Sequence, residues 1–204
     1  MRAAAIILAG GRASRMGGGD KTLLDLNGQP VLAHVIERLA RQIEHIAINA
    51  NGDPGRFEAF GLPVIPDHNQ NFDGPLAGIL AGLSWAEVNE FDHVVTVAGD
   101  TPFFPETLTS ALLAQAGADT IAVASSGRRL HPTFALWPTS LRSDVESQLA
   151  KGQRRVVDLF ARHITIAVDF ADLAHEGGAV DPFFNVNTPD DLAQAQLIAA
   201  KLAP

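Results

Sequence analysis

The chain of 204 residues is 47% hydrophobic and 19% charged, and its net charge at pH 7 is -8. This composition excludes a wholly disordered chain, and the negative charge argues against nucleic acid as the partner, because proteins that bind the phosphate backbone carry basic patches. The length fits one domain, residues 1–204, and the absence of cysteine excludes disulfides, thiolate metal sites and a cysteine nucleophile.

The apolar stretches of the chain are short. None approaches the ~18 residues that a membrane span needs, and the apolar run at residues 3–8 is too short for the hydrophobic part of a signal peptide. We therefore expect a cytoplasmic protein with no membrane partner.

Strand-like apolar runs alternate with helix-like segments along most of the chain. This pattern predicts an α/β fold, a doubly wound and mostly parallel sheet with a Rossmann-like, nucleotide-binding N-terminal half. Proline and helical spacing of apolar residues mark the helices, and Thr188 is the expected N-cap of the last one. The expected strands are 3–9, 45–50, 62–65, 93–98, 119–124, 131–137 and 164–168, and the expected helices are 30–43, 74–83, 105–115, 138–150 and 189–202.

A glycine-rich loop follows the first expected strand, and residues 8–21 read LAGGRASRMGGGDK. Glycines let the main chain approach a ligand closely, and Arg12, Arg15 and Lys21 add the positive charge that a triphosphate requires. Neither the Walker pattern nor the G-x-G-x-x-G fingerprint is present. We interpret the loop as a nucleoside triphosphate site; the alternative is a flexible loop with solvated charges.

Polar residues end three of the expected strands. Asp100 follows 93–98 and is the expected ligand of a divalent cation that bridges phosphates, although an aspartate there is also a common turn or N-cap residue. Asn49 and Asn51 end the second strand, and Asp67 follows the third. These side chains suit a base or a ribose, and each is equally consistent with a turn.

Other catalytic patterns are absent from the sequence or weak in it. The seven histidines lack the spacing of zinc ligands, and no G-x-S-x-G elbow occurs. His131 precedes Pro132 at a strand start, where an ordinary edge histidine is the favoured interpretation. Arg154 and Arg155 are consistent with an anionic substrate or with a solvated charge pair.

The glycine-rich loop resembles the signature of the nucleotidyltransferases, and further segments narrow the resemblance to the molybdenum cofactor guanylyltransferases. The loop alone marks only the wider superfamily. The supporting segments are 48–51 (INAN), 66–67 (PD), 74–78 (GPLAG), 99–102 (GDTP), 131–133 (HPT), 152–155 (GQRR) and 184–189 (FNVNTP).

The resemblance implies transfer of GMP from GTP to the terminal phosphate of molybdenum-bound molybdopterin, with Mg²⁺ as cofactor and pyrophosphate as the second product. The N-terminal half would bind nucleotide and the C-terminal half molybdopterin, with transient contacts to molybdopterin-loading proteins and acceptor molybdoenzymes. Alternatives are a transferase that uses CTP or a sugar phosphate, and a non-catalytic nucleotide or molybdopterin-binding module. The implied roles are catalysis by Arg15, Lys21 and Asp100, GTP binding by Leu8, Ala9, Gly10, Gly11, Lys21, Asn49, Asp67 and Asp100, Mg²⁺ binding by Asp100, and molybdopterin binding by Asn185 and Asn187.

Overall fold

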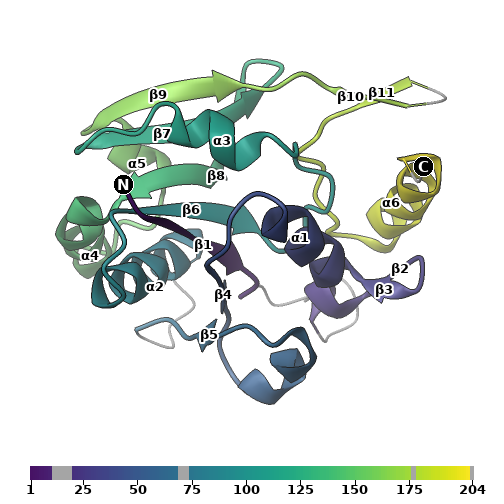
Figure 1. Cartoon of the computed structure of the whole chain (residues 1–204), viewed down its shortest axis with the longest axis horizontal. Helices are drawn as coiled ribbons and strands as arrows, with labels where there is room; N and C mark the ends of the chain where they lie inside the picture. The colour runs from purple at the N-terminus through teal and green to yellow at the C-terminus, as the bar shows by residue number, and fades with distance from the viewer. Residues whose placement is uncertain (11–19, 69–73, 176–177, 203–204) are drawn as a thin grey trace.

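A seven-stranded sheet forms the centre of the computed structural model, which describes residues 1–10, 20–68, 74–175 and 178–202 (Figure 1). The strand order is β5-β4-β1-β6-β8-β7-β9, and β8 alone among these seven runs antiparallel to its neighbours. The mostly parallel α/β sheet is therefore confirmed. The strands are β1 (Ala3–Leu8), β4 (Ile46–Asn49), β5 (Val64–Ile65), β6 (His93–Ala98), β7 (Thr120–Ser126), β8 (Arg129–Pro138) and β9 (Ile164–Asp169).

Helices cover both faces of this sheet. Successive side chains of a strand point to opposite faces, so Ala5 and Ile7 of β1 pack with α1 and α3, whereas Ala4 and Ile6 pack with α2, α4 and α5. A third cluster joins α6 to the short strands beside it. The helices are α1 (Val31–Ala40), α2 (Pro75–Val88), α3 (Leu108–Leu113), α4 (Arg142–Ala150), α5 (Val157–Phe160) and α6 (Pro189–Leu202), with 3-10 turns at Lys21–Leu23, Pro54–Phe60 and Thr139–Leu141.

The expected strands are present, but some short elements were not expected. These are the hairpin of β2 (Asp25–Leu26) and β3 (Gln29–Pro30), the pair β10 (Leu173–His175) and β11 (Gly178–Val180), and helix α5. The expected helix at 105–115 is shorter, since α3 spans only Leu108–Leu113. Among the described residues, no helix combines the length and the apolar character that crossing a membrane requires.

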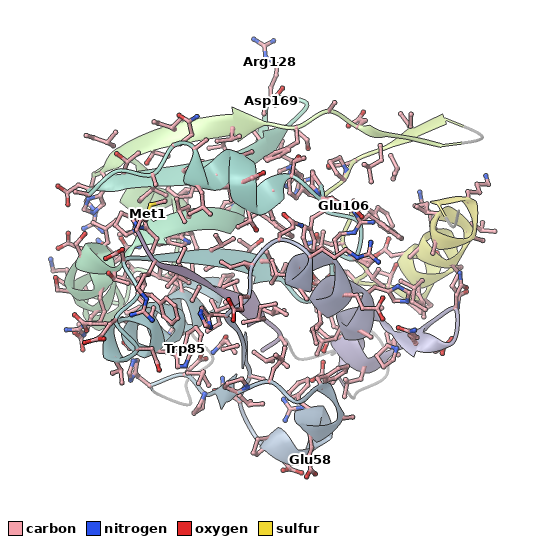
Figure 2. The ribbon with its side chains drawn as sticks, viewed as in Figure 1. Met1, Glu58, Trp85, Glu106, Arg128 and Asp169 are labelled. Atoms are coloured by element: carbon pink, nitrogen blue, oxygen red, sulfur yellow. The ribbon has the colours of Figure 1, made fainter. Side chains whose placement is uncertain are left out.

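The hairpin between β7 and β8 accounts for the antiparallel strand. Gly127 and Arg128 both have positive φ values, 51° and 68°, which is what a tight hairpin turn demands. Figure 2 shows Arg128 projecting from the tip of this hairpin, away from the body of the molecule. The turn reverses the chain within two residues, so β8 fills the position between β6 and β7 without a crossover helix.

Two glycines of helix α2 face the sheet and let the helix pack closely against it. A Cβ atom on Gly82 would lie 2.7 Å from Cγ2 of Ile6, and one on Gly78 would lie 2.3 Å from Oδ1 of Asn49. Both distances are shorter than any carbon contact allows. The small residues of this helix therefore serve its packing on β1 and β4.

The chain reverses its winding direction at β1. It passes through α1 to β4 and β5 on one side of β1, and returns through α2 to β6 on the other side (Figure 1). Leu8 pairs with both Asn49 and Ala98, so the carboxyl ends of three parallel strands meet in one row. Open α/β sheets bind ligands in the crevice at such a point.

Candidate active site

A cavity of about 350 Å³ opens at this row of strand ends. Segments far apart in the sequence form its walls: the ends of β1, β4 and β6, the first residues of α2, and the segment before α6. Most of the expected site residues are brought together here, whereas Gly11, Arg12 and Arg15 lie outside the described residues. The expected residues that line the cavity are Leu8, Ala9, Gly10, Lys21, Asn49, Asp67, Asp100, Asn185 and Asn187.

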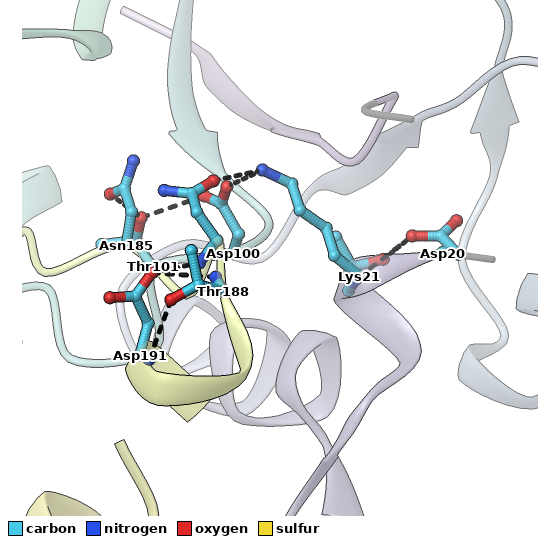
Figure 3. A network of polar contacts seen from close by, with 9 residues as sticks. Asp20, Lys21, Asp100, Thr101, Asn185, Thr188 and Asp191 are labelled. Carbon is cyan, nitrogen blue, oxygen red and sulfur yellow. Dashed lines mark hydrogen bonds and ion pairs between the residues drawn. The ribbon is translucent and has the colours of Figure 1, made fainter. Parts of the chain in front are cut away.

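Lys21 lies at the centre of the polar contacts in this cavity (Figure 3). Its ammonium group forms an ion pair with the carboxylate of Asp100 and donates a hydrogen bond of 2.8 Å to Oδ1 of Asn187. The side chains of Lys21 and Asp100 are only 19% and 10% exposed, so water screens this pair weakly. The ammonium group therefore lies between two oxygen acceptors, one just after β6 and one in the C-terminal segment.

The position of Lys21 is set by the residue before it. Oδ1 of Asp20 accepts hydrogen bonds from the backbone N–H of Thr22, at 3.1 Å, and from its hydroxyl, at 2.7 Å. Asp20 is therefore the N-cap of the 3-10 turn that carries Lys21. The cap holds the turn beside β6, so the lysine reaches the end of that strand.

The segment 185–191 completes the site from the C-terminal side. The N–H of Val186 donates to the carbonyl of Asp100 at 2.8 Å, and the hydroxyl of Thr101 lies 2.6 Å from Oδ1 of Asn185. The capping expectation is confirmed, because the N–H of Asp191 donates to Oγ1 of Thr188 and Oδ2 of Asp191 accepts from the N–H of Thr188.

The two asparagines of this segment present the same group to the cavity. Oδ1 of Asn187 accepts from Lys21 and Oδ1 of Asn185 accepts from Thr101, so each amide oxygen is already used inside the protein. Within the part of the chain that the structure describes, no acceptor contacts the amide NH₂ of either residue, so both remain donors. A pair of neutral donors next to an ammonium group suits a phosphate.

A second set of contacts holds Asp67 at the far end of the cavity. Oδ1 of Asp67 accepts from Nδ2 of Asn49 at 2.9 Å, and Oδ2 accepts from Nδ2 of Asn51 at 2.7 Å. Nδ2 of Asn49 also donates to the carbonyl of Ile65 at 3.1 Å. Both N–H donors of Asn49 are therefore engaged, and this buried residue orients Asp67 while keeping its own oxygen available.

Arg56 connects the two ends of the cavity. Its Nε donates to Oδ2 of Asp20 at 3.1 Å, and one terminal nitrogen donates to the carbonyl of Asn51 at 2.7 Å. The guanidinium also lies over the ring of Phe57, 4.5 Å from its centroid. The residue that caps the Lys21 turn and the residue that holds Asp67 are thus joined by one side chain.

The oxygen atoms around the ammonium group of Lys21 are suitable ligands for a divalent cation. The described residues contain no cluster of three His, Asp or Glu side chains that could hold a metal by themselves. The oxygens of Asp100 and Asn187 nevertheless already flank one positive charge, and hard cations such as Mg²⁺ take one or two protein oxygens and complete their shell with phosphate and water. The residues present therefore suit Mg²⁺ that arrives with a nucleotide.

A second cavity of about 420 Å³ adjoins the first and shares Thr133, Asn185 and Asn187 with it. Its lining includes His131 and Asp181, which both lie near the hydroxyl of Ser126. Burial lowers the pKa of His131 below its ordinary value, and Asp181 opposes part of that effect. Arg154 and Arg155 are exposed and line neither cavity.

Several of these residues were not predicted as site residues. The contacts of Arg56 and Asp20 span 36 positions and leave no local sequence signal. The sequence predicts Asn51 only as a contact to a base or a ribose, or as a turn residue. Asp191 had a detectable signal, because Thr188 and Asp191 have the spacing of a capping box.

Comparisons with known proteins relate the whole chain to one family. The family model of the MobA-like NTP transferase domain matches residues 5–166. A molybdenum cofactor guanylyltransferase of Mesorhizobium japonicum is 52% identical over 94% of this chain and 93% of that protein, and one of a Bradyrhizobium strain is 45% identical over 96% and 92%. The crystal structure of molybdopterin-guanine dinucleotide biosynthesis protein A from Archaeoglobus fulgidus has the same fold, with a TM-score of 0.73 and 22% identity over 96% of this chain and 98% of that one.

Proposed function

The chain belongs to the MobA-like NTP transferase family, and we propose that it transfers GMP from GTP to the terminal phosphate of molybdenum-bound molybdopterin. The products are molybdopterin guanine dinucleotide and pyrophosphate. One observation carries this proposal: the ammonium group of Lys21 lies between Asp100 and Asn187, where the two cavities share their wall. The positive charge of Lys21 and the amide groups that donate hydrogen bonds to phosphate therefore lie at the place where two substrates would join.

We assign the first cavity to GTP, so that the N-terminal half of the chain binds the nucleotide. Asp67 accepts hydrogen bonds from the nucleoside, and Asn49 and Asn51 keep its carboxylate in place. The main chain at Leu8, Ala9 and Gly10 borders the phosphates, and Lys21 exchanges Asp100 for a phosphate oxygen when GTP enters. Mg²⁺ would be held by Asp100 and Oδ1 of Asn187, where it would supply positive charge to the phosphates.

We assign the junction of the two cavities to the acceptor phosphate. The NH₂ groups of Asn185 and Asn187 donate to its oxygens and orient it toward the α-phosphorus of GTP. The acceptor phosphate is itself the nucleophile, so positioning and charge neutralisation carry the catalysis, and the protein needs no general base. One P–O bond forms to the acceptor oxygen, and the bond to the β-phosphate oxygen breaks as pyrophosphate leaves.

The test is pyrophosphate release with Mg²⁺ and each of GTP, CTP, ATP and UTP, with and without molybdenum-loaded molybdopterin. The proposal expects release only with GTP and the acceptor together. Release with CTP would instead indicate a cytidylyltransferase. Binding of GTP with no release under any condition would indicate a binding module.

Variants of two aspartates on the same chain sharpen this test. Asp100→Asn removes the carboxylate that would hold Mg²⁺ and should lower turnover by at least about a hundredfold, because the positive charge that stabilises the transition state is bound less well. Asp92→Asn is the matched control, since Asp92 lies outside the first cavity, at the entrance to β6. Full activity in the Asp100 variant would contradict the assignment.

A further inference from the structure

The second cavity continues directly from the junction assigned to the acceptor phosphate. The two cavities share Asn185 and Asn187, whose NH₂ groups face that junction. A molecule whose phosphate binds these donors can therefore extend its other end into the second cavity. The groups that line this cavity determine what that end can be.

The protons of Ser126, His131 and Asp181 can be assigned from their contacts. Oγ of Ser126 lies 2.9 Å from Oδ1 of Asp181 and 2.7 Å from Nε2 of His131. An ionised carboxylate only accepts hydrogen bonds, so the single hydroxyl proton of Ser126 goes to Asp181. Nε2 of His131 must then carry a proton and donate to Ser126, which leaves Nδ1 with a lone pair.

The wall formed by His131 and Asp181 is rich in acceptors. Among the described residues, Nδ1 of His131 and Oδ2 of Asp181 have no hydrogen-bond partner, whereas Oδ1 of Asp181 also accepts from the N–H of Phe183 at 2.9 Å. The imidazole stacks on the ring of Phe183, with centroids 4.2 Å apart, which fixes its plane. Asp191 adds a second carboxylate to the lining.

This arrangement determines how a ligand is oriented in the second cavity. Asp181 and Asp191 give its described lining two carboxylates against one guanidinium, that of Arg129, so an anionic group binds at the amide donors of the junction and an uncharged, N–H-rich group binds at the wall of His131 and Asp181. A 2-amino-4-oxo-pyrimidine edge matches such a wall, because its ring N–H and exocyclic amino group are adjacent donors. The half-buried Phe184 adds an aromatic side chain to the lining, which suits a fused ring.

We propose that the second cavity is the subsite for the heterocycle of the acceptor, and that His131 and Asp181 are specificity-determining residues that accept hydrogen bonds from its ring N–H and amino group. This inference rests on the proposed function for the identity of the acceptor as a pterin. Ser126 is a positioning residue, since it orders the protons of the other two.

The experiment uses two neutral probes that differ only at the recognised edge. Binding of 6-hydroxymethylpterin and of 6-hydroxymethyllumazine, which has an oxygen in place of the 2-amino group, is followed by their fluorescence. The wild-type protein should prefer the pterin by at least about tenfold, the selectivity of one lost hydrogen bond to a charged group. Equal binding of both probes, or no binding of either, would overturn the inference.

Two variants and a control test whether His131 and Asp181 recognise the pterin edge. His131→Phe keeps the stacked ring and removes the acceptor, and Asp181→Asn replaces one acceptor by a donor; both should abolish the preference for the pterin. Asp169→Asn is the matched control, because Asp169 also accepts from a serine, Ser125, at 3.0 Å, but lies at the end of β9, outside the second cavity (Figure 2). Variants of His131 and Asp181 that behave like this control would overturn the inference.

GTP binding and GMP transfer, measured on the same proteins, separate this inference from the proposed function. Unchanged GTP affinity in each variant shows an intact fold and an intact first cavity. GMP transfer without selective pterin binding would refute the subsite alone. Selective pterin binding without GMP transfer under any condition would refute the proposed function and leave the subsite in place.

Discussion

Replacing Gly78 by alanine should damage the nucleotide site through a single methyl group. The added Cβ would lie 2.3 Å from Oδ1 and 3.0 Å from Cγ of Asn49, and 2.8 Å from Cδ2 of Leu8. The Leu8 methyl can rotate away. Asn49 cannot move without releasing Asp67 and the carbonyl of Ile65, because its Nδ2 is bonded to both.

The magnitude follows from opposing effects. Alanine favours the helix over glycine by about 1 kcal/mol. Displacing Asn49 removes two hydrogen bonds, worth about 1 kcal/mol for the carbonyl partner and about 2 kcal/mol for the carboxylate partner. Crowding of the packed core adds about 1 kcal/mol or more. The folded state should therefore lose roughly 3 kcal/mol, and GTP affinity should fall by about tenfold or more as Asp67 loses its orientation.

Gly82→Ala is the comparison that isolates the effect on the site. Its three nearest neighbours would all be atoms of Ile6, with Cγ2 at 2.7 Å and Cδ1 at 3.1 Å, and this side chain lies behind the cavity in the core. Denaturant unfolding should show both variants destabilised, whereas equilibrium titration with GTP should show weakened binding for Gly78→Ala alone. Equal GTP affinities for the two variants would refute the reasoning that Gly78 protects Asn49.

Three further predictions concern the contacts around the site. Arg56→Gln should raise the KM for GTP several-fold and leave the KM for the acceptor unchanged, because it removes the hydrogen bonds from Arg56 to Asp20 and Asn51. Steady-state kinetics, with Arg41→Gln as the exposed control, checks this, and equal changes in both KM values would contradict it. Because burial lowers the pKa of His131 in the folded state, the unfolded chain takes up that proton first, so the contribution of the neutral ring to stability is complete above its ordinary value of 6.5 and is lost as the pH falls below it. Denaturant midpoints at about pH 7.5 and about pH 5.5 should therefore differ less for His131→Phe than for the wild type, and an identical difference would be evidence against a buried neutral ring. Thr188→Ala should lower the free energy of unfolding by about 1 kcal/mol, whereas Thr188→Ser should leave it unchanged, because only serine keeps the capping hydroxyl. Unchanged stability of the alanine variant in denaturant unfolding would show that the cap does not stabilise α6.

The strand ends were predictable from the sequence because their pattern is local. Parallel strands covered on both faces are continuous apolar runs, and the first polar residue after each run marks the edge where ligands bind. Asn49, Asp67 and Asp100 were found in this way, and the structure brings them to one cavity. The pattern of the glycine-rich loop is equally local, but its interpretation as a triphosphate site stays a prediction, since Gly11, Arg12 and Arg15 lie outside the described residues.

The remaining contacts could not be predicted because they depend on the assembled fold. Arg56 meets Asp20 only when the turn after β4 lies beside the turn after β1. The orientation of the Asn187 amide depends on Lys21, 166 positions earlier in the chain. Helix α5 and the pairs β2–β3 and β10–β11 are too short for hydrophobic periodicity to show.

The segment 185–191 follows every strand of the central sheet in the chain, so the site is not complete until this segment has been synthesised. Asp100 is added to the growing chain before the residues that complete the site, because Val186, which donates to its carbonyl, and Asn187, which accepts from Lys21, lie 86 and 87 positions after it. At typical rates of synthesis this interval lasts on the order of ten seconds. A nascent chain can therefore form the nucleotide crevice while the acceptor side is still missing, so it does not expose a working centre to its substrates until segment 185–191 has been added.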